Sequence, residues 1–302
     1  MKLINILPVR NEGHELGCTL RSMLDWCDEV VILEHLCTDD THQIVETVNS
    51  EQPGCIHVVS DDRPEWNEMQ QRQRLLEEAR RHGATHIAVM DADELLTANL
   101  IPKIRNFIER LAPKNFWGIK TYNLHGSLDR YRSDPSVWGE RAGTLVAFAD
   151  HPSLSWIRRD GGDYHQRAPI GSHIHGMIPR ECGGNLHLQF VSRRRLVAKH
   201  RWYKMMERLR WPMKPVAEID RLYSQAVDEA GLQTATAPRN WLNHRQHLDM
   251  DREPWQEQEC RRLLAEHGAA KFRGLNLYGL IEDQQQCQTL RSVPAPCQAV
   301  AP

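Results

Sequence analysis

Four short apolar segments recur in the first ninety residues, and amphipathic segments with helical spacing separate them. The apolar segments are expected to be strands, and they cover residues 2–7, 29–34, 55–59 and 86–90. The helices expected between them cover residues 15–26, 41–49 and 65–81. Strands that alternate with helices form a parallel sheet with helices on its faces. The sequence therefore predicts an α/β fold, in which ligands bind at the carboxyl edge of the sheet.

Acidic side chains are concentrated in the loops at that edge. The last of these loops, Asp91-Ala92-Asp93-Glu94, directly follows the apolar run of residues 86–90. In an extended backbone, residues two apart point to the same side, so Asp91 and Asp93 are expected to face one site while Ala92 turns into the protein. Carboxylates are hard oxygen ligands that suit Mg²⁺ or Mn²⁺, and such an ion can bridge to a substrate diphosphate.

The composition limits the kinds of partner. Lysine and arginine number 38 against 40 aspartates and glutamates, so any basic surface must be local. No apolar run approaches the roughly 20 residues that span a bilayer, and the first residues have too short an apolar core for a signal peptide. The eight cysteines form no Cys-x-x-Cys pair. We therefore expect reduced thiols in a soluble, cytoplasmic protein without a transmembrane segment.

Four motifs, in this order, resemble those of the family-2 glycosyltransferases, which have the GT-A fold. Residues 7–12 resemble the opening strand and its Pro-x-x-Asn-Glu loop, and residues 30–41 the second strand and its acidic turn. Residues 67–75, which include Arg72, resemble the helix before the metal-binding strand, and residues 89–94 resemble that strand with its Asp-x-Asp motif. Residues 145–148 and 152–156 resemble a segment of bacterial members, which indicates a bacterial or phage-like member.

The resemblance implies a site for a nucleoside-diphosphate sugar. Glu34 and the backbone around Pro8 would hold the base and ribose, and Arg72 would face the diphosphate. In place of the usual Asp-Asp-Gly-Ser turn, the chain has Glu34-His35-Leu36-Cys37. The expected nucleotide-sugar-binding residues are Pro8, Arg10, Glu12, Glu34, Asp39, Arg72, Asp91, Lys199 and Tyr203.

The same resemblance implies a site for Mn²⁺ or Mg²⁺, with Asp91, Asp93 and His187 as the expected metal ligands. Asp93 would ligate the ion, and Asp91 would contact it, a metal-bound water or the ribose. His187 lies in an expected strand, residues 185–190, where many GT-A enzymes have a third metal ligand. In the basic helix expected over residues 191–211, Lys199 and Tyr203 match residues that similar enzymes place near the diphosphate.

An inverting transfer needs a base that takes the proton of the acceptor hydroxyl. The candidate carboxylates in the middle of the chain are Glu140, Asp160, Asp163 and Glu181. We favour Glu140 because it precedes an expected strand beside the metal-binding sheet. The expected acceptor is a glycan, a lipid-linked molecule or a protein rather than a nucleic acid.

These expectations divide the chain into four parts. Residues 1–112 and 113–190 would form the nucleotide-sugar-binding half and the acceptor-side half of a GT-A domain. Residues 191–282 would form a C-terminal helical extension, and residues 283–302 a disordered tail. The predicted function is metal-dependent transfer of a sugar from a nucleoside-diphosphate sugar to an acceptor hydroxyl, with inversion. Two alternatives stay open, a catalytically degenerate GT-A-fold binding or scaffold protein and a nucleotidyltransferase.

Overall fold

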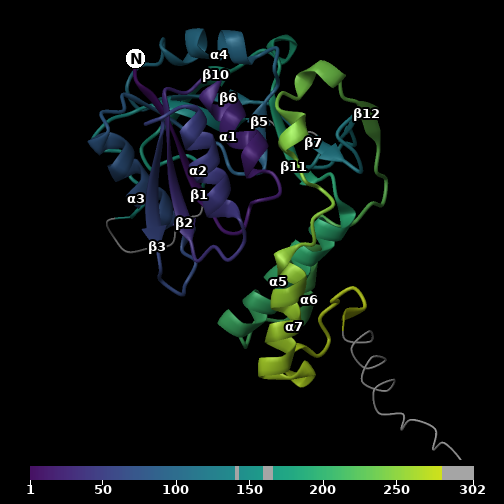
Figure 1. Ribbon diagram of the computed structural model, residues 1–302. Helices are drawn as coiled ribbons and strands as arrows, with labels where there is room; N and C mark the ends of the chain where they lie inside the picture. Colours follow the sequence, from purple (N-terminus) through teal and green to yellow (C-terminus); the bar gives the residue numbers. More distant parts are fainter. Residues whose placement is uncertain (140–142, 159–165, 281–302) are drawn as a thin grey trace, which may run out of the picture. The chain divides into compact units, whose positions relative to one another are not determined.

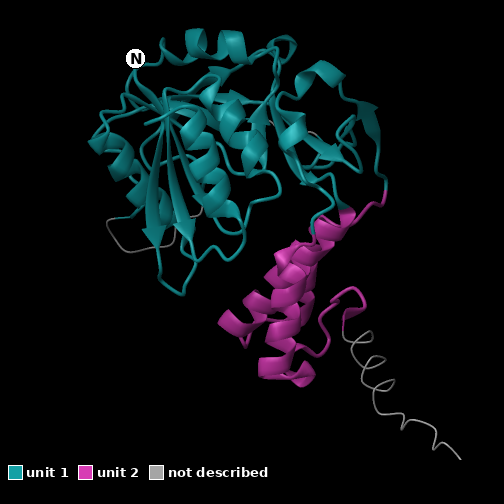
Figure 2. Cartoon of the chain, viewed as in Figure 1, with its two compact units in different colours: residues 1–192, 231–252 teal, residues 193–230, 253–302 magenta. Residues whose placement is uncertain are grey.

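The structure of the protein is a computed structural model that describes residues 1–139, 143–158 and 166–280. The chain forms two compact units, which Figure 2 shows in different colours. The first unit comprises residues 1–192 and 231–252, and the second comprises residues 193–230 and 253–302.

A seven-stranded, mostly parallel sheet forms the centre of the first unit (Figure 1). Among the described residues, β9 alone runs antiparallel to its neighbours, β4 and β6. The α/β fold that the alternating segments predicted is therefore confirmed. The strands in spatial order are β10 (His173–Met177), β6 (Asn115–Ile119), β9 (Thr144–Ala149), β4 (His86–Ala88), β1 (Leu3–Val9), β2 (Glu29–His35) and β3 (Ile56–Asp61).

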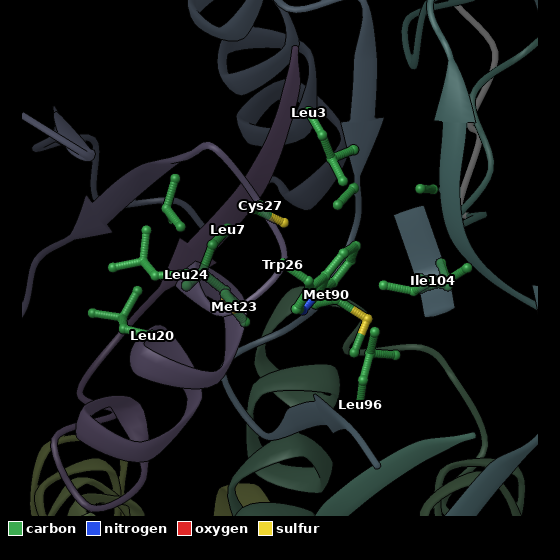
Figure 3. Close-up of a cluster of buried hydrophobic side chains, with 14 of the residues drawn as sticks. Leu3, Leu7, Leu20, Met23, Leu24, Trp26, Cys27, Met90, Leu96 and Ile104 are labelled. Carbon is green, nitrogen blue, oxygen red and sulfur yellow. The ribbon is translucent and has the colours of Figure 1, made fainter. Parts of the chain in front are cut away.

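Helices cover both faces of this sheet because successive strand residues point to opposite sides. In β1, Leu3 and Leu7 pack into one apolar cluster, whereas Ile4 and Ile6 pack into another. Figure 3 shows the first cluster, in which Leu7 and Met23 lie close together. Burial on both faces explains why these strands are continuous apolar runs in the sequence. The helices are α1 (Leu16–Leu24), α2 (Thr41–Glu51) and α4 (Ile101–Ile108) on the first cluster and α3 (Glu68–Arg81) on the second.

After the acidic motif, the chain enters a second, five-stranded sheet of the first unit. β11 pairs in parallel with β7 and antiparallel with β5, and β12 pairs with β8. The sequence did not predict β5, β8 or β12, because these three-residue strands show no alternating pattern and, unlike β4, are not part of a longer apolar run that the sequence identifies as a strand. The order is β12 (Thr234–Thr236), β8 (Arg130–Arg132), β7 (Thr121–His125), β11 (Asn185–Phe190) and β5 (Glu94–Leu96).

Three helices with their own apolar cluster form the second unit: α5 (Arg193–Arg210), α6 (Val216–Ser224) and α7 (Trp255–His267). The predicted helical extension, residues 191–282, differs from the structure because residues 231–252 belong to the first unit, where β12 pairs with β8. The predicted tail, residues 283–302, lies outside the described residues. None of the described helices combines the length and apolar character needed to cross a membrane. The 3₁₀ helices are η1 (Arg180–Cys182), η2 (Arg239–Trp241), η3 (Arg245–His247) and η4 (Ala269–Phe272).

Candidate active site

The acidic motif forms a turn through which the chain passes from the first sheet to the second. Where β4 ends, the side chain of Asn5 continues the pairing, because its Oδ1 accepts a hydrogen bond from the Met90 N–H at 3.0 Å. The Glu94 N–H then donates to the Asp91 carbonyl at 3.0 Å. The expected extended backbone is therefore wrong at this point, and the side chains of Asp91 and Asp93 meet different partners.

Asp91 accepts hydrogen bonds from two arginines. Its Oδ1 lies 2.9 Å from Nη2 of Arg72, and its Oδ2 lies 3.2 Å from Nη1 of Arg167. Burial raises the pKa of Asp91, but the two guanidinium groups outweigh that effect and hold it below its usual value. Asp91 is therefore an anion whose two oxygens both accept from cations, and its expected role as a metal ligand stays a prediction.

Arg167 connects the acidic turn to the neighbouring strand. Its Nε donates to the Leu145 carbonyl at 2.9 Å, and its Nη2 donates to the Val89 carbonyl and to Oε2 of Glu94. Glu94 is buried, and its Oε1 accepts from Nδ2 of Asn185 at 2.9 Å. Burial lowers the pKa of Arg167, but Glu94 and Asp91 outweigh that effect and raise it above its usual value. Arg167 belongs to none of the motifs recognised in the sequence.

Arg72, on α3, presents a donor without a partner. The helix begins after Asn67, whose Oδ1 accepts from the Gln70 N–H at 3.1 Å. Arg72 is 3% exposed, and its Nε donates to Glu68 at 2.9 Å. Within the described part of the chain, its Nη1 has no hydrogen-bond partner. A buried donor left unpaired costs about 1–3 kcal/mol, so this atom suits an incoming anionic oxygen.

Asp93 faces His187, which lies on β11. Oδ2 of Asp93 is 3.2 Å from Nε2 of His187, and Oδ1 of Asn123 is 2.7 Å from Nδ1. This arrangement follows from strand pairing, because β11 runs beside β5 with His187 opposite Glu94, the residue after Asp93. Both ring nitrogens therefore face oxygen acceptors, whereas a neutral imidazole has a single N–H. Nε2 and the Asp93 carboxylate therefore need either a second ring proton or a metal ion between them.

A divalent cation fits this donor set. Asp93 and His187 offer a carboxylate oxygen and an imidazole nitrogen, and their side chains are 15% and 9% exposed. Neighbouring ligands of an octahedral ion with bonds near 2.1 Å lie about 3 Å apart, close to the observed separation. Since Nδ1 donates to Asn123, Nε2 is the nitrogen left for a metal ion.

The residues expected to hold the base and ribose lie at the carboxyl ends of β1 and β2. The carboxylate of Glu34 lies 3.1 Å from Nδ1 of His42, and its side chain is 13% exposed. Pro8 and Arg10 are half-buried at the end of β1. Burial lowers the pKa of His35, and the charge of Arg10 lowers it further.

Two of the expected residues join the loops that follow β1 and β2. The side chain of Asp39 accepts hydrogen bonds from the N–H groups of Gly13 and Thr41, each at 3.0 Å. The backbone N–H of Glu12 donates to Oγ1 of Thr41 at 3.0 Å. These contacts hold the loops together, and contact of Asp39 or Glu12 with a nucleotide stays a prediction.

Other expected site residues lie elsewhere in the chain. Lys199 and Tyr203 are on α5 in the second unit, where the Tyr203 ring packs at 5.6 Å from that of Tyr223. Their contact with a diphosphate stays a prediction. Glu181 is exposed on η1. The other three candidate bases lie outside the described residues: Glu140, Asp160 and Asp163.

Among solved structures, residues 1–349 of S. aureus TarS in complex with UDP-GlcNAc are 15% identical to this chain, with a TM-score of 0.42. The similarity covers 75% of this chain and 72% of that one, but this chain spans 43% of a longer TarS structure. GalNAc-T7 with UDP, GalNAc and Mn²⁺ is 13% identical, with a TM-score of 0.39, over 89% of this chain and 58% of that one. No curated protein matches the sequence.

A family model provides the direct assignment. Residues 5–161, more than half of the 302 residues, match the model described as glycosyl transferase family 2. The matched segment includes Arg72 and the acidic turn with Asp91 and Asp93, whereas Arg167 and His187 follow it. These residues form the site described above, and the chain belongs to glycosyl transferase family 2.

Proposed function

We propose that this glycosyltransferase depends on a divalent cation, Mn²⁺ or Mg²⁺, and transfers a sugar from a nucleoside-diphosphate sugar to an acceptor hydroxyl with inversion. The observation that supports metal dependence most strongly is the placement of His187 between two oxygen acceptors, Asp93 and Asn123. The acceptor that we propose is a glycan, a lipid-linked molecule or a protein.

Asp93 and His187 are the residues that would hold the cation. When bound, the cation supplies Lewis-acid stabilisation of the negative charge that develops on the departing diphosphate. Asn123 fixes the orientation of the His187 ring, so that Nε2 faces Asp93. Such a support group prepares the ligand geometry before the substrate arrives.

The two arginines act on the same diphosphate in different ways. Nη1 of Arg72, which has no hydrogen-bond partner among the described residues, provides a donor for a phosphate oxygen. Arg167 donates to both Asp91 and Glu94, and so reduces the repulsion that two carboxylates would exert on an anionic substrate. Asp91 in turn positions the guanidinium of Arg72 through its bond to Nη2.

We propose Glu140 as the base that removes the proton from the acceptor hydroxyl. Inversion needs one such base, because the hydroxyl oxygen attacks the anomeric carbon from the face opposite the diphosphate. The bond from the sugar to the diphosphate breaks as the new glycosidic bond forms, and the hydroxyl proton passes to the carboxylate. This role rests on sequence position, since Glu140 lies outside the described residues.

Metal removal tests this proposal. We expect EDTA to stop turnover of the nucleotide sugar and added Mn²⁺ or Mg²⁺ to restore it. We expect Asp93→Asn to lower turnover by about 10³-fold or more, because the amide is a weaker ligand without charge. Glu140→Gln should lower transfer by at least about 10²-fold without weakening nucleotide binding.

Asn99→Ala is the matched control for these substitutions, since its amide donates to the Cys182 carbonyl and none of the side-chain hydrogen bonds among the described residues joins it to Asp91, Asp93 or His187. Full turnover in EDTA, or an Asp93→Asn variant as active as the parent protein, would contradict the metal site. NMR of the product measures its anomeric configuration, and retention would contradict the inverting mechanism.

A further inference from the structure

The turn that joins α5 to α6, residues 211–215, exposes large apolar side chains. Met213 is 92% exposed, and Trp211 is 53% exposed. Met206 on α5 and Leu222 on α6 are also exposed, at 39% and 48%. Exposed apolar side chains grouped on adjoining segments mark a surface that contacts a partner or a membrane.

The backbone of this turn leaves few polar groups in need of water. Pro212 and Pro215 have no N–H group, and the N–H groups of Trp211 and Lys214 donate to carbonyls of the chain at 2.9 and 3.0 Å. The carbonyls of Pro212 and Lys214 accept from Nη1 of Arg208 at 2.7 and 3.2 Å. A segment with its backbone groups satisfied internally can enter an apolar medium at low cost.

Positive charge accompanies the exposed apolar side chains. The guanidinium carbon of Arg210 lies 5.6 Å from the centre of the Trp211 ring. Lys214, in the turn itself, pairs with Glu207 at 2.7 Å and with Glu218 at 3.5 Å. Residues 206–222, which span the exposed side chains, carry 4 lysines and arginines against 3 aspartates and glutamates, and residues 193–204, at the start of α5, carry 6 against none. The surroundings of the turn thus have a small excess of positive charge, and the larger excess lies at the start of α5.

We propose that the turn of residues 211–215 binds a membrane surface with anionic lipid headgroups, and that Trp211 and Met213 insert at its interface. Tryptophan favours the headgroup level, where its ring is in apolar surroundings and its N–H stays near water. Basic residues beside the inserted side chains add attraction to anionic lipids. The cations beside the turn and the internal hydrogen bonds of its backbone together favour a lipid surface, and not a groove on another protein, as its partner.

Vesicle sedimentation with the full chain tests this proposal. We expect the protein to pellet with vesicles that contain phosphatidylglycerol, and to bind vesicles of phosphatidylcholine alone much more weakly. Raised salt should weaken the binding to anionic vesicles, since it screens the charges. The double substitution Trp211→Ala and Met213→Ser should lower the partition coefficient about tenfold or more. The matched control is Val137→Ser, which removes an apolar side chain 63% exposed in the first unit.

The far-ultraviolet circular dichroism and the calorimetric transition of the second unit should be the same in the double variant as in the parent protein, which shows that the helical unit of the variant is folded. Asp93→Asn should bind vesicles as the parent protein does. A failure of the proposed catalytic site can therefore be told apart from a failure of the membrane proposal. Equal binding of the double variant and the parent protein would overturn the proposal. A parent protein that stays in the supernatant with every vesicle would also overturn it, and would assign the surface to a protein partner.

Discussion

At the scale of single residues, the candidate site depends on how a few charges are paired. Asp91 is held by Arg72 and Arg167, whereas Asp93 faces His187. The two aspartates of this motif therefore contact different partners, because the backbone between them forms a turn and not an extended strand. The orientation of His187 depends on the Asn123 side chain, which makes Asn123 a positioning residue rather than a ligand.

Asn123→Ala tests this positioning role. Without the oxygen that accepts from Nδ1, the His187 ring is free to rotate, and we expect the affinity for Mn²⁺ to fall about 10–100-fold. Calorimetric titration of Mn²⁺ in the presence of nucleotide measures this change. Asn123→Asp keeps an oxygen acceptor and should restore most of the affinity, whereas Asn99→Ala should leave it unchanged. Wild-type Mn²⁺ affinity in Asn123→Ala would remove Asn123 from the metal site.

At the scale of elements, α5 carries ionisable groups in its buried face. Lys204 is fully buried and pairs with Asp220 at 2.9 Å, and its Nζ also donates to Oγ of Ser224 at 2.9 Å. Burial, and then the charges of Lys199 and Lys204, lower the pKa of His200 to about 4. His200 is therefore neutral in the folded protein at pH values where an unfolded chain would bind a proton.

The buried, neutral state of His200 predicts that the protein becomes less stable in acid. Between pH 6.5 and pH 4 the unfolded chain binds a proton at His200 and the folded chain does not, so the free energy of unfolding falls as the pH falls. The loss is at most about 3 kcal/mol. Urea unfolding at several pH values measures it, and His200→Phe should flatten the dependence, whereas His173→Gln, at an exposed position, should not. An unchanged pH dependence in His200→Phe would contradict the buried neutral state.

The strands differ in how far the sequence alone predicts them. The sequence predicted β1 to β4 and the bounds of β11. A continuous apolar run or an alternation of apolar and polar residues is visible within the strand's own sequence. It could not predict β5 or β12, which exist only through pairing with strands distant in the chain. The role of Arg167 depends on the same kind of long-range contact, with Leu145 and Val89.

At the scale of the whole molecule, each unit has an apolar core of its own. Residues of the helical cluster, such as Leu263 and Phe272, lie in the second unit, whereas Leu7 and Ile6 belong to clusters in the first. The residues of the proposed donor site, Asp91, Asp93 and His187, belong to the first unit. The stability of the helical unit and the affinity for nucleotide should therefore be separable.

Leu263→Ala tests this separation. Loss of a buried leucine side chain should lower the stability of the second unit by about 2–5 kcal/mol. In scanning calorimetry we expect one transition to move to lower temperature, with nucleotide affinity unchanged. Leu7→Ala, the matched substitution in the first unit, should move the other transition. A single transition that both substitutions shift equally would show that the two units unfold together.

The most direct test of the proposed metal-dependent donor site is a calorimetric titration of UDP, GDP, dTDP and CDP, each with and without Mn²⁺, into the parent protein and Asp93→Asn. We expect one nucleotide to bind tightly, its binding to need Mn²⁺, and Asp93→Asn to abolish the metal-dependent part of the binding. Equal affinity with and without Mn²⁺, or unchanged Mn²⁺-dependent binding to Asp93→Asn, would rule out the proposed metal site. Absence of binding by all four nucleotides would favour a glycosyltransferase fold that serves as a scaffold.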